Sequence, residues 1–336
     1  MEHRRFTSIE QFKNIVKHVR DYAKKDSKPL PTLKFNGTVK IHGTNASVLF
    51  SPEQWWAQSR ERVLSIESDN AGFCMFAERN LETFRAIEHN VRRLLDDISG
   101  TVAIYGEWAG KGIQKAVGVN QIDKFFCVFN ICVYQGEQKI HLTKDQMVAV
   151  IVRTPDIHLI HDFSSYEVEI DFNNPSAVQN FLYEKTMEVE KECPVAKQLG
   201  ATPENGSMVG EGIVWLNEET HLIMKTKGSE HVAGAHKVST VKDVSPAEIE
   251  RMNSIQEFVE NMVSDARLHQ GIEKMKELNH PLENKSTGNF IKWVVADTVK
   301  EEKDVIVASG FDAKEIMPKI SDKAKNFWFK YLEENT

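Results

Sequence analysis

A change of hydrophobic pattern near residue 236 constrains the fold of this chain more than any other feature. Before it, from about residue 35 to residue 227, short runs rich in β-branched and aromatic residues alternate with turn formers, as in strands. Two longer stretches, residues 76–97 and 175–192, are expected to be helical. We therefore predict an α+β domain with mixed, largely antiparallel sheets over residues 1–236. The strand-like runs are 38–41, 47–50, 101–105, 125–133, 212–216 and 221–227.

Beyond that point the signals are those of helices. Residues 245–248, Ser-Pro-Ala-Glu, form a capping box with proline at the first helical position. A second cap-like sequence begins at Asp312, and Ser321 is expected to open a last helix. We predict at least three helices in a small all-α C-terminal domain, residues 245–336, joined to the first domain by a linker at 237–244.

Composition sets limits on function. The chain has 336 residues, of which 41% are hydrophobic and 27% charged, as in a soluble globular protein. Its net charge of −7 argues against a protein that coats nucleic acid non-specifically, although a local basic site is still possible. The N-terminus lacks a signal-like apolar stretch, and no run approaches the roughly 18–20 apolar residues needed to span a bilayer. We expect a cytoplasmic protein without membrane attachment, in the host cytoplasm if it belongs to a phage.

The four cysteines show no metal-ligand spacing and are expected to be reduced and buried. Cys127 and Cys132 lie in one strand-like run. Because their spacing is odd, we predict that they face opposite sides of the strand.

The sharpest local sequence is residues 40–45, Lys-Ile-His-Gly-Thr-Asn, which would place Lys40 at the end of a strand. A lysine nucleophile must be neutral, and with a reference pKa of about 10.4 it needs burial or neighbouring cations to become so. A Lys-x-x-Gly sequence alone is weak evidence, because the chain contains six of them, beginning at Lys34, Lys40, Lys115, Lys197, Lys225 and Lys285.

Further distinctive segments follow in order. They are residues 105–110 (Tyr-Gly-Glu-Trp-Ala-Gly), 112–115 (Gly-Ile-Gln-Lys), the aromatic run 125–131, 211–214 (Glu-Gly-Ile-Val) and 224–227 (Met-Lys-Thr-Lys). This ordered set, with residues 40–45, resembles the RNA ligase 2 family of phages and the related RNA-editing ligases. These enzymes are covalent nucleotidyltransferases, and the resemblance covers most of residues 35–230.

The resemblance implies an ATP-dependent RNA ligase whose first domain, residues 1–236, carries the nucleotidyltransferase chemistry. Lys40 would attack ATP to form a lysine–AMP intermediate, and the AMP would pass to a 5′-phosphate before a 3′-hydroxyl displaces it. Nicked duplex RNA is the implied substrate, ATP and Mg²⁺ (or Mn²⁺) are the implied cofactors, and a monomer is the implied state.

Two lysines and a glutamate are expected to surround Lys40. Lys225 and Lys227 are two residues apart on a strand and so project from one face, where they would hold the triphosphate and favour a neutral amine. The Glu211 carboxylate suits Mg²⁺. A four-residue hairpin loop would turn Glu211 away from both lysines, whereas an odd-length loop or a bulge would bring all three together. We predict that they come together.

The resemblance assigns roles to three more residues, each with a simpler alternative. Glu107 would bind the ribose hydroxyls, or be an ordinary surface glutamate. Phe129 would stack on adenine, or be a core aromatic. Arg60 would contact the nucleotide or the RNA strand, or be an arginine in a polar loop.

Residues flanking Lys40 complete the predicted site. Val39 and Ile41 are its neighbours. By resemblance His42 acts within the site and Asn45 binds the nucleotide, and for each the alternative is that it only shapes the turn. Three positions depart from the family pattern and affect base recognition: Val39 replaces a frequent Glu, Asn130 a common Asp, and Leu216 lies where relatives often have Lys.

Other classes fit less well. DNA ligases and mRNA-capping guanylyltransferases share the lysine chemistry, but they usually carry a β-barrel after the paired lysines and have Asp where this chain has His42. The glycines of residues 106–112 are one residue too close for a P-loop, and Gly112 replaces the required Ser or Thr. A non-catalytic RNA-binding protein with the same fold is a further alternative.

Overall fold

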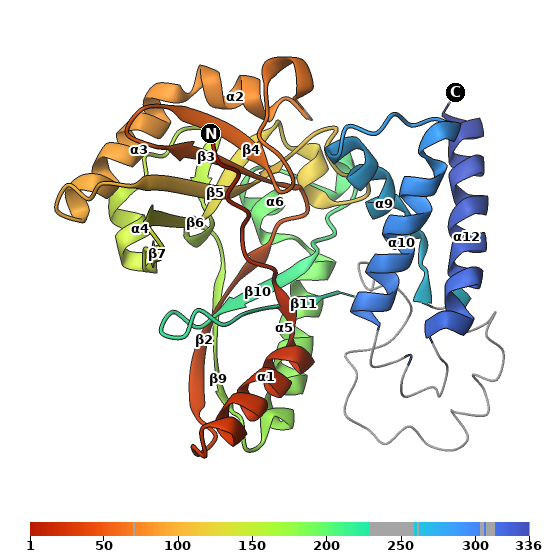
Figure 1. The fold of residues 1–336 in the computed structure, drawn as a ribbon, viewed down its shortest axis with the longest axis horizontal. Helices are drawn as coiled ribbons and strands as arrows, with labels where there is room; N and C mark the ends of the chain where they lie inside the picture. Colours follow the sequence, from red (N-terminus) through yellow and green to blue (C-terminus); the bar gives the residue numbers. More distant parts are fainter. Residues whose placement is uncertain (70, 229–258, 261, 303–305, 307–312, 336) are drawn as a thin grey trace. The chain divides into compact units, whose positions relative to one another are not determined.

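The computed structural model describes residues 1–69, 71–228, 259–260, 262–302, 306 and 313–335. The chain divides into two compact units, Met1–Gly228 and Ser229–Thr336, shown in Figure 1. The predicted linker at 237–244, the capping box at 245–248 and the cap residue Asp312 lie outside the described residues.

The first unit contains two sheets. The first sheet has the strand order β1-β11-β10-β2-β9, and its neighbours are antiparallel except for β1, which is parallel to β11. Helices α1 and α5 pack against β11, as Figure 1 shows. The elements are β1 (Glu10–Gln11), α1 (Phe12–Lys25), β2 (Thr32–Lys40), β9 (Ser165–Asp171), α5 (Gln179–Lys191), β10 (Gly212–Leu216) and β11 (Ile223–Lys227).

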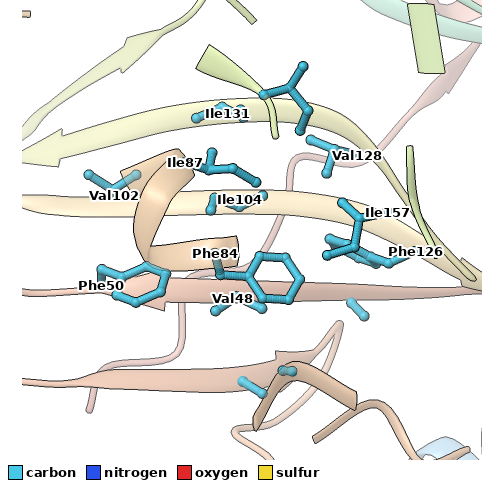
Figure 2. Close-up of a cluster of buried hydrophobic side chains, with 14 of the residues drawn as sticks. Val48, Phe50, Phe84, Ile87, Val102, Ile104, Phe126, Val128, Ile131 and Ile157 are labelled. Atoms are coloured by element: carbon cyan, nitrogen blue, oxygen red, sulfur yellow. The ribbon is translucent and has the colours of Figure 1, made fainter. Parts of the chain in front are cut away.

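The second sheet has the order β4-β3-β5-β6-β7, with β8 parallel to β6. One face is covered by helices: Figure 2 shows Phe84 and Ile87 of α3 packed over the strands that carry Val48 and Ile104. The elements are β3 (Thr44–Phe50), β4 (Trp55–Ser59), α2 (Phe73–Arg79), α3 (Leu81–Leu94), β5 (Thr101–Ala109), β6 (Phe125–Gln135), β7 (Gln138–His141), α4 (Lys144–Val150) and β8 (Ile157–Leu159). A short helix, α6 (Pro194–Gln198), completes the unit.

A bulge interrupts the pairing of β5 with β6. Tyr105 lies opposite Asn130 but Gly106 lies opposite Val128, so Phe129 is an extra residue without a partner on β5. A bulge shifts the alternation of side chains by one residue. Cys127 and Cys132 therefore share one face of β6, and the prediction that they face opposite sides is wrong.

The segment before β1 packs on the other face of the second sheet. Phe6 is buried there against Tyr105 and Trp56. The backbone of Arg4 exchanges two hydrogen bonds with the Gln58 side chain, and its carbonyl also accepts from the Tyr105 hydroxyl at 2.7 Å. Because β1 then joins the first sheet, this N-terminal segment, residues 3–11, links the two sheets.

The second unit is helical over its described residues, with α9 (Asp265–Glu277), α10 (Thr287–Glu301) and α12 (Ala313–Glu334) around a core that includes Phe290 and Trp328. The prediction that Ser321 opens a helix is wrong. It lies inside α12, where its hydroxyl donates to the carbonyl of Met317 at 2.8 Å. The helix also passes Pro318, which is exposed, so water can replace the hydrogen bond that proline does not donate.

The predicted α+β class with a helical C-terminal region is confirmed, and each predicted strand run falls in or overlaps a strand of the structure. The predicted helix over residues 76–97 is two helices instead, α2 and α3, which are separated by Asn80, and α3 ends at Leu94. Helix α1 was not predicted. Within the described residues, no helix has both the length and the apolar character required to cross a membrane.

Candidate active site

Lys40 is the last residue of β2, and residues 41–43 carry the chain across to β3 in the other sheet. This crossing requires glycine at position 43, because a Cβ there would lie 2.3 Å from the carbonyl oxygen of Trp108. The Gly43 N–H donates to Glu107 Oε1 at 3.0 Å, and its carbonyl accepts from Gln114 Nε2 at 3.1 Å. The second sheet therefore fixes the turn that follows Lys40.

Glu211, just before β10, is the centre of the cluster. Its side chain is only 2% exposed. One carboxylate oxygen, Oε2, accepts from Lys40 Nζ at 2.6 Å and lies 3.1 Å from His42 Nδ1. The other, Oε1, lies 2.9 Å from Lys227 Nζ. Lys40 and Lys227 thus bind opposite oxygens of one buried carboxylate.

The charges of this cluster do not cancel. Burial raises the pKa of Glu211, but the positive charges of Lys227 and Lys40, together with His42, outweigh it and hold that pKa well below its usual range. The carboxylate is therefore ionised, and the two ammonium groups leave excess positive charge beside it. Such a site attracts an anionic ligand, for example a phosphate.

The orientation of Glu211 depends on Gly212. The loop between β10 and β11, residues 217–222, has an even number of residues, so strict alternation would turn Glu211 away from Lys227. Gly212 has a φ of +146°, which breaks the alternation, and a Cβ there would lie 2.0 Å from the carbonyl oxygen of Thr226. Glu211 therefore meets Lys227 through local backbone geometry. Lys225 lies two residues earlier on the same face of β11, opposite Val214 and Gln11.

Glu107 lies on β5 directly opposite Asn45 of β3. Burial is the main cause that raises the pKa of Glu107, to about 7, and the negative charge of Glu211 adds to it; Lys40, the Gly43 N–H and Arg60 act in the opposite direction. Near neutral pH this carboxyl is present in both forms, so it can accept from or donate to a ligand hydroxyl. Arg60 directly follows β4.

The remaining predicted residues lie on β2, directly after it, or on β6. Phe129 is the bulged residue of β6. Its side chain is partly buried, and its ring centroid is 5.0 Å from that of Phe6. Val39 and Ile41 are 2% and 4% exposed and pack in the core of the first sheet, so only their backbone is available to a ligand. Asn130 is buried, and its Oδ1 has no hydrogen-bond partner among the described residues.

The carboxylates of this site suit a divalent cation only in part. In the portion of the chain that the structure describes, no three or more His, Cys, Asp or Glu side chains gather as a metal site. Mg²⁺ usually takes one or two protein carboxylates and completes its shell with phosphates and water. Glu211, with Glu107 nearby, fits an ion of that kind held jointly with a nucleotide.

Two residues that contact predicted site residues are not among those predicted from the sequence. Gln114 donates to the carbonyl of Gly43, in the turn after Lys40. Its membership of the distinctive segment 112–115 is the sequence feature that could have identified it. Phe6 contacts Phe129, and the sequence contained no local sign of it because the contact joins residues far apart in the chain.

Comparisons with known proteins give one family. A family model described as RNA ligase matches residues 34–232. No curated protein matches the chain. The similar solved structures include the RNA ligase of Naegleria gruberi with PPi, at 15% identity and a TM-score of 0.45 over 68% of this chain and 57% of that one. A mutant of that ligase with AMP and Mn has 14% identity and a TM-score of 0.44, over 67% and 56%. The chain thus spans little more than half the length of these proteins.

Proposed function

Because the chain belongs to the RNA ligase family, we propose that it is an ATP-dependent RNA ligase joining 3′-hydroxyl and 5′-phosphate ends at nicks in duplex RNA. One observation carries this proposal. Lys40, at the end of β2, and Lys227, at the end of β11, bind the same buried carboxylate, which places a candidate nucleophile beside a second cation.

The first step is attack of Lys40 on the α-phosphate of ATP, with pyrophosphate as the leaving group. An ammonium bound to a carboxylate is not a nucleophile, so Lys40 must first separate from Glu211 and lose its proton. Lys225 and Lys227 then stabilise the charge that develops on the α-phosphate. The product is an AMP joined to Lys40 through a phosphorus–nitrogen bond.

The two later steps use the same cations. A 5′-phosphate on RNA takes the AMP from Lys40, and the neighbouring 3′-hydroxyl then attacks that 5′-phosphate and releases AMP. Each step moves charge through a five-coordinate phosphorus, so one set of positive groups serves all three. The turn at 41–43, fixed by Glu107 and Gln114, keeps Lys40 in place throughout.

The remaining residues hold the nucleotide in this proposal. Glu107 and Asn45 bind the ribose, Phe129 stacks on adenine, and Arg60 contacts the nucleotide or the RNA strand. Glu211 would hold Mg²⁺ or Mn²⁺ with the phosphates, where the ion supplies positive charge to the reacting phosphate. Val39 and Ile41 contribute backbone only.

A cytoplasmic monomer is part of the same proposal. All four cysteines are buried free thiols, which fits a reducing compartment. The −7 net charge fits an enzyme that binds RNA through a local basic surface and not over its whole area.

The test is to incubate the protein with ATP labelled at the α-phosphate and Mg²⁺, denature it, and look for label on the chain. Wild type is expected to be labelled, and Lys40→Ala is not. Labelled protein, given nicked RNA, is then expected to release AMP as the nick closes. A parallel sample with labelled GTP should stay unlabelled, whereas labelling by GTP would favour a capping-type enzyme.

Lys34→Ala is the matched control. Lys34 begins another Lys-x-x-Gly sequence on the same strand, but its exposed side chain pairs with Glu167 and not with Glu211. It is expected to be labelled like wild type. Label that survives in Lys40→Ala rejects Lys40 as the nucleophile, and an unlabelled wild type rejects ligase chemistry in favour of a binding protein.

A further inference from the structure

Helix α1 carries a stripe of positive charge that the proposed chemistry does not use. Its apolar side, Ile15, Val19 and Ala23, is buried. Its cations recur at helical spacing: Lys13, Lys17, Arg20 and Lys24 occupy positions i, i+4, i+7 and i+11 and so form one line along the helix. Lys17, Arg20 and Lys24 are exposed, and within the part of the chain that the structure describes none of them forms an ion pair.

Helix stability does not explain this arrangement. Cations near the C-terminal end of a helix are favourable, which accounts for Lys24 and Lys25. Lys13 lies in the first turn, where a cation is unfavourable, and that turn contains no acidic residue. Lys13 with Lys17, and Arg20 with Lys24, are also like charges four residues apart, which repel.

The stripe also differs from the rest of the molecule. Helix α1 has five lysines and arginines against one acidic residue, Asp21. By contrast α5, which also packs on β11, has two lysines and three glutamates. The whole chain has a net charge of −7, so the concentration of positive charge on α1 runs against the overall balance.

The stripe begins directly after the edge strand of the first sheet. Gln11, the last residue of β1, lies opposite Lys225 of β11, and α1 begins at the next residue. From Lys13 to Lys24 the helix rises about 17 Å, enough to follow several phosphates of a nucleic-acid strand. Because α1 packs with Met224, it lies on the face of the first sheet opposite to Lys225 and Lys227. Its cations therefore add positive charge along the edge of the sheet that carries these two lysines.

We propose that α1 is a docking surface for the phosphate backbone of RNA, guiding the strand that leads to Lys40. This inference rests on the proposed function for the identity of the polyanion. Charge complementarity is the reason for choosing RNA: a line of exposed lysine and arginine side chains suits a phosphate backbone of any sequence. The exposed Tyr22 of α1 lies off this line at helical spacing.

The test removes the stripe without disturbing the helix, in the triple variant Lys17→Gln, Arg20→Gln, Lys24→Gln. Glutamine is a good helix former, and all three sites are exposed. Binding to nicked duplex RNA is measured by fluorescence anisotropy over a range of salt concentrations. We expect Kd at about 0.1 M salt to rise at least about tenfold, and the slope of log K against log salt to become less steep by about 2–3.

The control removes three exposed cations that lie apart from one another: Lys34→Gln on β2, Arg93→Gln on α3 and Lys197→Gln on α6. It lowers net charge equally, so it is expected to change Kd by no more than about twofold. A stripe variant whose Kd and salt slope equal those of wild type would overturn the proposal. Equal weakening in both would do so too, because only bulk charge would then matter.

Labelling by ATP alone separates this inference from the proposed function. That reaction needs no RNA, so both triple variants should be labelled as wild type is. A wild type that takes no label overturns the ligase proposal, whereas the binding comparison still decides whether α1 contacts RNA.

Discussion

At the scale of single residues, the candidate site depends on a glycine that carries no functional group. Glu211 meets Lys227 only because Gly212 adopts a φ of +146° at the entry to β10. Other residues are strongly disfavoured in that conformation. The backbone of β11 also approaches so closely that a side chain at 212 has no room.

Gly212→Ala is therefore expected to cost at least about 2 kcal/mol in the free energy of unfolding, and to slow labelling by ATP at least about tenfold. A Cβ at this position would lie 2.0 Å from the Thr226 carbonyl, so β10 must shift and separate Glu211 from Lys227. Urea denaturation and the rate of labelling per folded protein are the two measurements.

Gly136→Ala is the control. Gly136 also has a positive φ, +59°, but a Cβ there would meet nothing within 4 Å. It should cost only about 1 kcal/mol and leave labelling unchanged. If Gly212→Ala took label at the wild-type rate, the orientation of Glu211 would not matter for the first step.

Residue-level prediction from sequence succeeded where periodicity decides and failed where backbone geometry does. Two lysines at 225 and 227 must share a face of a strand, and they do. Whether Glu211 faces them could not be read from loop length, because the deciding φ belongs to one glycine. The prediction that Cys127 and Cys132 face opposite sides of β6 is wrong for a related reason, because the bulge at Phe129 depends on how β6 pairs with β5.

At the scale of elements, the N-terminal segment is the least expected part of the site. Phe6 packs edge-on against Phe129, with ring planes at 67°, and Tyr105 of β5 holds the preceding backbone. Because Phe129 is a bulged residue, its direction depends on what it packs against. Phe6 is therefore a positioning residue for the proposed adenine contact.

Phe6→Leu is expected to raise the KM for ATP in the labelling reaction about three- to tenfold, with the rate at saturating ATP nearly unchanged. The smaller side chain loosens Phe129 but does not alter the lysines around Glu211. Stability should fall by about 1–1.5 kcal/mol, since the volume change is modest. Labelling rates over a range of ATP concentrations give the KM.

Phe84→Leu supplies the comparison, because Phe84 is fully buried on the opposite face of the second sheet, among the side chains of Figure 2. It should lose as much stability or more, with no change in KM. Equal changes in KM in both variants would mean that Phe6 acts only through overall stability.

Elements were predicted unevenly from the sequence, for identifiable reasons. Helix α1 was missed although Ile15, Val19 and Ala23 recur at helical spacing, because a short amphipathic pattern without a capping residue is a weak signal. The sequence predicts a helix start at Ser321, because serine is a good N-cap. In α12 its hydroxyl donates to the carbonyl of Met317 instead of capping a helix. The sequence around Ser321 does not reveal that the helix begins before it.

At the scale of the whole molecule, each unit contains its own hydrophobic core. The clusters around Phe84, Trp215 and Phe6 belong to the first unit, and the cluster around Trp328 belongs to the second. Every residue of the candidate site precedes Gly228. A unit with its own core and all the candidate catalytic residues is expected to fold and to react with ATP alone.

A chain ending after residue 236 should therefore take label from ATP at a rate within about twofold of the full chain, and should show a cooperative thermal transition of its own. Sealing of nicked RNA should fall at least about tenfold, because that step also requires RNA to be held across the break. Lys40→Ala in the shortened chain should take no label, which shows that the reaction is the same one. Loss of labelling in a shortened chain that still unfolds cooperatively would mean that residues after 236 contribute to the nucleotide site. Undiminished sealing would mean that the first unit, including α1, holds the RNA without help from the second unit.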